Sequence, residues 1–505
     1  MSRRKKKNQV TLISLLAVLV LLSGFYLWYM NRDRFAGRTD KDTSEADTSL
    51  IIATMDPERI ETIHFKNEKA DMTFIREEDV WILEADRNRP IKQNYIKNMI
   101  NLMDEVKAER MVNEKPEDLG QYGLASPFAS INATQTDGKT IAIRLGSKAV
   151  GAQGYYAMID GNDAVYILPT LYGTNLSYSD MDMTQVENGP SITSNDIYHI
   201  EISYRDGEDF ELIYDPDSIH HIAGTPLLSW AVLKPYEEVY AADSSKVSEL
   251  LSKYSSFDFL ACVEYSTETF DKYGLDGPQA SVFVEYYEKH EAQTAEADTN
   301  SDSDDNTTGE VIIEEKNFKL YIGDKNDNGD YYVRKDGDKA VYTMSAAKVE
   351  EMLTVDAFGI LSTFVNLHNI DTVDEIDIDI GGTHYTMEIK RETVTNAEGE
   401  EETISVYYYN GELTEEDKFK DLYQVMIAAK MDIQLKEEVS VSNLKPALTM
   451  SYHISGSEEP YITSYYSYDD SFYLIDSGYP VRFAADKRKI DGIIKAVQEF
   501  RLAED

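Results

Sequence analysis

Cysteine is almost absent from this sequence. Cys262 is the single cysteine among 505 residues, so no disulfide can form within the chain. One thiol cannot make a cysteine-rich zinc site either, and no cysteine stands near the N-terminus where a lipid could be attached.

Basic residues are scarce as well. The chain has 49 Lys and Arg against 92 Asp and Glu, a formal net charge of −43, and its one basic cluster lies at residues 3–7. Such a surface repels phosphate, which excludes binding of nucleic acid or anionic lipid headgroups by charge steering. The acidity is typical of a soluble surface, and attraction to cations or to a basic partner is the alternative.

Catalytic motifs are missing too. The sequence has no glycine-rich phosphate loop and no HExxH motif. Ser345 and Lys348 fit the SxxK pattern of penicillin-recognising enzymes, but the accompanying KTG element is absent, so Ser345 is expected to cap a helix. Asp324 opens a stretch that resembles a calcium-binding loop, but Lys335 stands where a bidentate glutamate should be, which favours a hairpin turn. We therefore expect neither an enzyme nor a bound cofactor or metal.

Histidine and acidic residues form two further patterns. His220 and His221 are adjacent, and neighbouring residues of a strand point to opposite faces, which disfavours a shared metal. Glu375, Asp377 and Asp379 alternate along one predicted strand. A solvated strand face is the favoured interpretation, and a general acid/base pair is the alternative.

Tyrosine is abundant, with 35 copies and runs at residues 407–409 and 465–466. The β-propensity of a sheet-rich protein explains this abundance, and stacking of sugars on exposed rings is the alternative. Asn132, Asn175 and Asn306 match the glycosylation acceptor pattern, which matters only in a secretory host.

The sequence contains one long hydrophobic run. It begins at Val10 and ends at Met30, 21 residues without a charge, which is about 31 Å as a helix and matches the hydrocarbon layer. Basic residues precede it and aromatic residues crowd its other end. The positive-inside rule then predicts a cytoplasmic N-terminus and an extracytoplasmic bulk. A cleaved signal peptide is the alternative, but small residues do not follow the run.

A short phrase occurs twice in the chain, as DLGQYGLASP at residues 118–127 and as TFDKYGLDGP at residues 269–278. Each copy follows a tryptophan strand and an amphipathic helix, and precedes a glycine-ended strand, a tyrosine pair and a valine-tyrosine strand. Internal repetition of this kind decides an architecture. The residues that define the repeat are Trp81, Tyr122, Gly123, Leu124 and Pro127, and Trp230, Tyr273, Gly274, Leu275 and Pro278.

The phrase is expected to have a structural role. Glycine after tyrosine suits a left-handed position at the end of a helical turn. The leucine can plug the core, the tyrosine can bury its ring with the hydroxyl hydrogen-bonded, and the proline can start an edge strand. Ligand stacking on Tyr122 and Tyr273 is the alternative.

The repeats predict an α+β protein with tandem antiparallel sheets, each with a packed helix, behind one N-terminal transmembrane helix. The expected parts are a cytoplasmic tip and anchor (1–31), a flexible tether (32–50), repeat one (51–190), repeat two (191–365) and a degenerate repeat three (366–505). Residues 291–310, an acidic stretch with a disordered composition, interrupt repeat two. Helices are predicted over 92–112, from about Ser244 with Asp243 or Ser244 as its cap, over 415–431 and over 486–502.

The tryptophan strand, the YGL phrase and the tyrosine strands together resemble an uncharacterised bacterial domain-of-unknown-function family. Its members are single-anchor proteins, commonly encoded beside ABC-type permease and ATPase components, including relatives of gliding-motility systems. The resemblance covers about residues 55–355 and implies no catalytic or binding residue. It does imply an extracytoplasmic protein-interaction module in the cell membrane, auxiliary to an ABC-type transport complex. A cell-envelope glycan-binding protein is the alternative.

Overall fold

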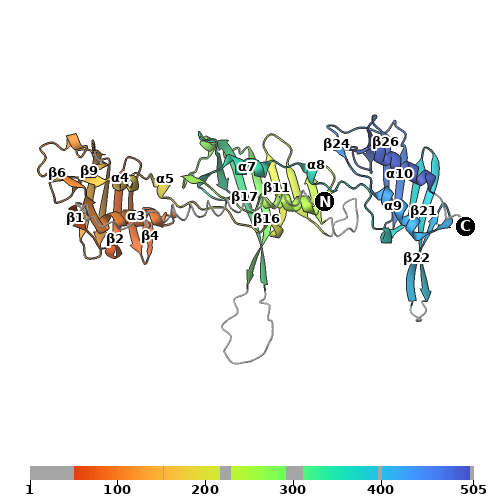
Figure 1. The fold of residues 1–505 in the computed structure, drawn as a ribbon, viewed down its shortest axis with the longest axis horizontal. Coiled ribbons are helices and arrows are strands. Elements are labelled where there is room, and N and C mark those ends of the chain that lie inside the picture. The colour runs from red at the N-terminus through yellow and green to blue at the C-terminus, as the bar shows by residue number, and fades with distance from the viewer. Residues whose placement is uncertain (1–49, 152, 217–228, 292–310, 396–400, 501–505) are drawn as a thin grey trace, which may run out of the picture. The chain divides into compact units, whose positions relative to one another are not determined.

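The computed structural model describes residues 50–151, 153–216, 229–291, 311–395 and 401–500 (Figure 1). The expected anchor and the interior of the acidic stretch lie outside these ranges. No helix among the described residues has both the length and the apolar character needed to cross a membrane. Among the described residues, those in 50–79 and 94–177 form one compact unit, and those in 80–93 and 178–500 form another.

The fold is α+β, as predicted, and its sheets are antiparallel. The first large sheet has the strand order β4-β3-β2-β7-β8-β9-β10-β6. Its strands are β2 (Ile60–Asn67), β3 (Asp71–Glu77), β4 (Val80–Leu83), β6 (Arg110–Asn113), β7 (Ala129–Gln135), β8 (Thr140–Lys148), β9 (Gly154–Ile159) and β10 (Val165–Pro169). A separate pair joins β1 (Leu50–Thr54) to β5 (Glu105–Ala108).

The second and third sheets share one strand order, β14-β13-β12-β11-β16-β17-β18-β19-β15 and β23-β22-β21-β20-β25-β26-β27-β28-β24. The second contains β11 (Ile197–Tyr204), β12 (Phe210–Tyr214), β13 (Trp230–Lys234), β14 (Tyr240–Ala241), β15 (Ala261–Glu264), β16 (Ala280–Glu291), β17 (Val311–Lys325), β18 (Tyr331–Lys335) and β19 (Val341–Met344). The third contains β20 (Val373–Ile380), β21 (Thr383–Thr395), β22 (Glu401–Tyr409), β23 (Glu412–Thr414), β24 (Ile433–Gln434), β25 (Leu448–Ile454), β26 (Tyr461–Ser467), β27 (Phe472–Asp476) and β28 (Phe483–Asp486).

The opening strand of each sheet carries the same irregularity. The pairing register shifts between Ile60 and Thr62 in β2, and again just after Ile197 in β11 and after Val373 in β20. Beyond the shift, alternate residues such as Ile63 and Ile200 are fully buried. A shared bulge fixes the same face of each opening strand toward its core, because a one-residue slip would turn every side chain over.

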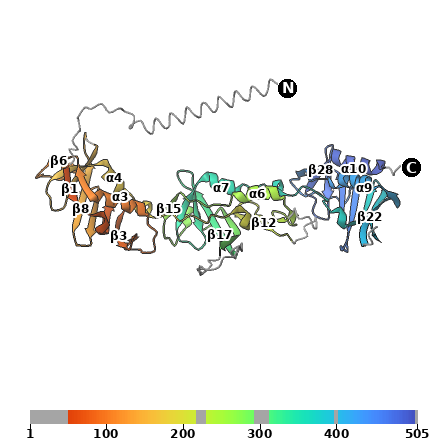
Figure 2. The same cartoon turned by 60° about the horizontal axis from the view of Figure 1, so that its bottom comes forward.

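Helices follow the first meander of each sheet. These three helices are α3 (Gln93–Asp104), α6 (Ser244–Ser252) and α9 (Glu416–Ile427). Other helices come after the last strand of a sheet: α4 (Thr170–Asn175), α5 (Asp180–Met183), α7 (Ala346–Leu353), α8 (Ala357–Ile360) and α10 (Lys487–Glu499). Figures 1 and 2 place α9 and α10 together against the third sheet, and both helices contact its strands. The side chain of Asp243 caps α6, as predicted, by accepting hydrogen bonds from two backbone N–H groups.

The helix predicted over 92–112 is too long. It ends at Asp104, and residues 105–113 form β5 and β6 instead. Val106 and Ala108 are fully buried while their neighbours are more exposed, a period of two that a strand satisfies. Pairing with β1 and β10 thus overrides the helical spacing that the sequence suggested.

Candidate functional site

The YGL phrase forms the same cap in the first two repeats. Tyr122 and Tyr273 each end a 3₁₀ turn, and the next residues, Gly123 and Gly274, have φ of 72° and 67°. The left-handed conformation predicted for both glycines is therefore present, and it is one that glycine adopts without steric cost.

A second glycine in each repeat lies directly against the backbone of the YGL turn. A Cβ on Gly146 of β8 would lie 2.1 Å from the carbonyl oxygen of Tyr122, and a Cβ on Gly323 of β17 would lie 2.1 Å from that of Tyr273. Leu124 and Leu275 are each only 2% exposed. The YGL turns thus pack on the glycines near the ends of β8 and β17, because only glycine permits this close backbone approach. We call Gly146 and Gly323 the glycine seats of the turns.

The two cap tyrosines differ in their partners. The Tyr273 hydroxyl donates to the Glu264 carboxylate at 2.6 Å, and the Lys272 ammonium lies 4.8 Å from the ring centre. Burial, followed by the bond to Glu264, raises the pKa of Tyr273. Tyr122 is half-buried, and its hydroxyl accepts a 3.3 Å hydrogen bond from Asn113. Both rings are packed and hydrogen-bonded as a structural role requires.

Proline and tryptophan complete the motif. Pro127 and Pro278 precede β7 and β16, which are interior strands of their sheets and not edge strands as predicted. Each proline stands before the first paired residue, so its missing N–H leaves no gap in the ladder. Trp81 and Trp230 are 7% and 9% exposed. Trp230 makes an edge contact with Tyr214 at 5.3 Å.

The catalytic and calcium-loop look-alikes have structural explanations. Ser345 caps α7, as predicted, by accepting a hydrogen bond from the Lys348 backbone N–H at 3.3 Å. The Lys348 ammonium donates to the carbonyl of Lys253 at 2.7 Å. Residues 326–330 form the turn between β17 and β18, with Gly329 at φ 89°. This is the predicted hairpin.

Acidic residues on the third sheet bind histidines. Asp377 lies 3.2 Å from His384 and 2.9 Å from His453, and Asp379 lies 3.3 Å from His384. The predicted solvated face therefore carries a chain of contacts between carboxylates and imidazoles, at side chains exposed by 30% to 55%. His220 and His221 lie outside the described residues. Asn132 is exposed, whereas Asn175 is 6% exposed and could not accept a glycan.

A charged network on the second sheet was not foreseen. His199 of β11 lies between Glu285 at 2.6 Å and Glu211 at 3.3 Å, and Lys234 lies 3.0 Å from Glu211 and 3.1 Å from Glu201. The hydrogen bonds that the Lys234 ammonium donates to the carboxylates of Glu211 and Glu201 raise the pKa of Lys234. The network depends on which residues face each other across four strands, β11, β12, β13 and β16, and the sequence alone does not specify that register.

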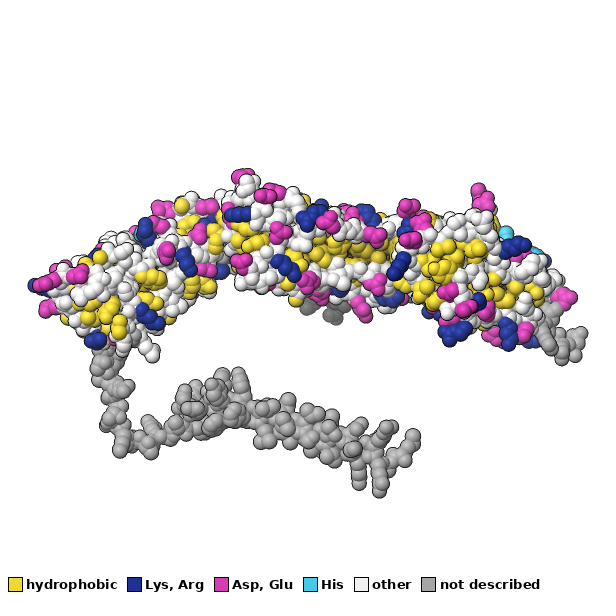
Figure 3. All heavy atoms as spheres, turned by 90° about the horizontal axis from the view of Figure 1, so that it is seen from above, with side chains coloured by type: hydrophobic (Ala, Val, Ile, Leu, Met, Phe, Trp, Pro, Cys, Tyr) yellow, Lys and Arg dark blue, Asp and Glu magenta, His cyan; other side chains and the backbone are white. Residues whose placement is uncertain are grey.

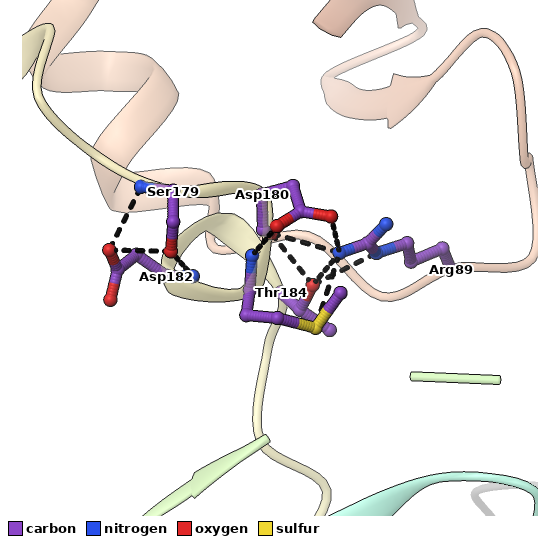
Figure 4. A network of polar contacts seen from close by, with 6 residues as sticks. Arg89, Ser179, Asp180, Asp182 and Thr184 are labelled. Carbon is purple, nitrogen blue, oxygen red and sulfur yellow. Dashed lines mark hydrogen bonds and ion pairs between the residues drawn. The ribbon is translucent and has the colours of Figure 1, made fainter. Parts of the chain in front are cut away.

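Arg89 makes a second polar network in the longer unit (Figure 4). Its guanidinium donates to the Thr184 hydroxyl at 2.6 and 2.9 Å and to the Asp180 carbonyl at 2.9 Å, and it lies 5.5 Å from the ring centre of Tyr265. The side chain is 12% exposed. Ser179 and Asp182 form a capping box that begins α5. These contacts tie residues 80–93 to residues 180–184 and to Tyr265 of the second repeat, and they are structural.

A hollow with aromatic walls lies beside the turn between β11 and β12. Its volume is about 470 Å³. Tyr204, Tyr236 and Phe358 contribute rings, and Asp206 and Asp356 contribute carboxylates. Rings beside carboxylates form a surface on which a sugar could stack and hydrogen-bond.

These features define a class of protein built from tandem antiparallel sheets with glycine-seated tyrosine caps. The chain belongs to the family described as Domain of unknown function (DUF4340), which it matches at residues 81–229 and 230–434. The two matches together cover more than two thirds of the sequence, and each begins at a repeat tryptophan. No curated protein and no solved structure matches the chain.

Proposed function

We propose that this protein is a membrane-anchored extracytoplasmic protein-interaction module, an auxiliary component of an ABC-type transport system. The apolar run at residues 10–30 supports the anchor and the orientation. The family resemblance supports the class of partner. The observation that carries the interaction role is a group of exposed apolar side chains on the hairpin made by β16 and β17.

This hairpin extends beyond its sheet (Figure 1). The register of β16 with β11 ends at Tyr286, whereas its pairing with β17 continues to Glu291. The outer part, residues 287–291 with 311–315, is therefore a two-stranded ribbon, which we call the arm. An isolated ribbon of this kind is marginally stable in water.

One face of the arm carries three large apolar side chains, together with the charged Lys289 and Glu315. Val311 and Ile313 alternate along β17 and face the same way as Tyr287, which pairs with Glu315. Val311 is 52% exposed, Ile313 58% and Tyr287 37%. Exposed apolar residues grouped on a protruding element mark an interaction site. Figure 3 shows hydrophobic side chains gathered in patches on the visible surface, among many acidic and basic ones.

The interaction role is tested by affinity purification of the full-length protein from detergent extracts of its own cells. Permease or ATPase components should co-purify. Ile313→Asp should abolish their recovery, whereas Ile312→Asp, on the opposite face of the same strand and 50% exposed, should retain it. Recovery of no transporter component with the unaltered protein would refute the proposal. Protease added to intact cells should also degrade the repeats.

A cell-envelope glycan-binding protein is the second candidate. The hollow lined by Tyr204, Tyr236 and Phe358 favours it, because rings and carboxylates together suit a sugar. Titration of the full chain with peptidoglycan fragments and wall polymers tests this candidate. Saturable binding that Tyr236→Ala removes would support it, and unsaturable or absent binding would reject it.

A further inference from the structure

The opposite face of the arm carries a different chemistry. Glu288 and His290 are two residues apart on β16, and Glu314 pairs directly with Glu288 across the ribbon. Since side chains alternate between the faces of a strand, all three lie on one face. Their ligand atoms lie within 4.8 Å of one another. Among the described residues, this is the one group of three or more His, Cys, Asp or Glu that comes so close.

We propose that Glu288, His290 and Glu314 bind a divalent transition-metal ion, for which zinc serves as the probe. Imidazole and carboxylate are both zinc ligands, and an open zinc site combines three protein ligands with a water molecule. Calcium and magnesium take oxygen ligands and gain little from an imidazole. The donor set therefore selects a borderline transition metal over the hard cations that the many other carboxylates could attract.

The three side chains can close on an ion without disturbing the core. The exposed fractions are 47% for Glu288, 48% for His290 and 48% for Glu314. Ligand atoms around tetrahedral zinc lie about 3.3 Å apart, given metal–ligand distances near 2.1 Å. Rotation about exposed side-chain torsions covers the remaining separation, while the β-ladder holds the three Cα atoms in place.

Lys316 marks the position at which a cation is stabilised. Its ammonium lies 2.6 Å from the Glu314 carboxylate and 3.8 Å from that of Glu288. The ammonium must leave for a metal to enter, which makes Lys316 a built-in competitor. Removing its charge should tighten metal binding.

The test is zinc binding to the full chain in detergent micelles, measured by calorimetry and by competition with a chromophoric chelator. One equivalent should bind most tightly, and Co²⁺ in its place should show the visible absorption of tetrahedral coordination. His290→Ala and Glu288→Gln should each weaken this site by about tenfold or more. Lys316→Met should strengthen it. Thermal unfolding of each variant verifies that the fold is retained.

Glu315→Gln is the matched control, because Glu315 lies next to Glu314 on β17 but on the other face of the arm. This substitution removes one negative charge, as Glu288→Gln does. It should leave zinc affinity within about twofold of the unaltered chain. Equal affinities for His290→Ala and Glu315→Gln would overturn the proposal, since binding would then reflect acidic surface charge alone. So would Mg²⁺ competing with Zn²⁺ at equal concentration, because an imidazole site does not accept magnesium in place of zinc.

Discussion

Replacing Gly323 by alanine should destabilise the second repeat strongly. The added Cβ would lie 2.1 Å from the Tyr273 carbonyl oxygen and 2.9 Å from the Leu275 side chain. Contacts below 3.0 Å are essentially never seen for a real Cβ, so the cap must shift by about 1 Å. Hydrogen bonds within the turn oppose that shift, because the N–H groups of Gly274 and Leu275 donate back to it at 2.9 and 3.2 Å.

The magnitude follows from overpacking. Inserting a methyl group into a well-packed site costs about 1–3 kcal/mol, and a clash with backbone cannot be relieved by a side-chain rotation. We therefore expect a loss near the upper end, about 3 kcal/mol. At about 2–4 °C per kcal/mol for a body of this size, unfolding of the repeat should move down by roughly 6–12 °C.

Calorimetry of the full chain measures this shift, and hydrogen exchange of residues 270–280 locates it. The matched control is Gly277→Ala four residues beyond Tyr273, where the added Cβ would meet nothing within 4 Å. That substitution should change stability by less than about 1 kcal/mol. If Gly323→Ala and Gly277→Ala unfold at the same temperature, the glycine seat is not what holds the cap.

Three further predictions concern hydrogen bonds and burial. Tyr273→Phe should cost about 1 kcal/mol in chemical denaturation because it removes the 2.6 Å bond to Glu264; an unchanged midpoint would contradict this. Asp243→Ala should destabilise α6 by about 1 kcal/mol, and Asp243→Asn, which can still cap, should recover most of that loss. Burial raises the pKa of Tyr172, whose hydroxyl donates to the Leu102 carbonyl, from 10.0 to about 12. The stability it contributes should be complete below pH 10 and lost as pH rises toward 12, which tyrosinate absorbance and alkaline unfolding of Tyr172→Phe can test.

The sequence pattern was sufficient to predict where one helix begins, but not where another ends. The cap at Asp243 was readable because a short polar side chain stood directly before an apolar stripe. The end of α3 was not, since residues 105–113 carry apolar residues at spacings compatible with either helix or strand. Pairing of β5 with β1 and of β6 with β10 decided the outcome.

The YGL cap and the arm also combine features that the sequence predicts with features that only the structure reveals. The left-handed glycines could be predicted because few residues other than glycine tolerate that conformation. The seats at Gly146 and Gly323 were visible only as strand-ending glycines, without their role. Glu288, His290 and Glu314 were not singled out, because 23 residues separate His290 from Glu314 along the chain and no local pattern records that they share a face.

The sequence by itself determined the repetition, the α+β class and the left-handed turns, because each depends on local conformation or on a periodicity within a few residues. Tertiary structure alone decided the common strand order, the shared bulge and the partners of His199 and Arg89. These depend on register between segments distant in the chain, which is set by the burial of whole faces and not by any one stretch of residues.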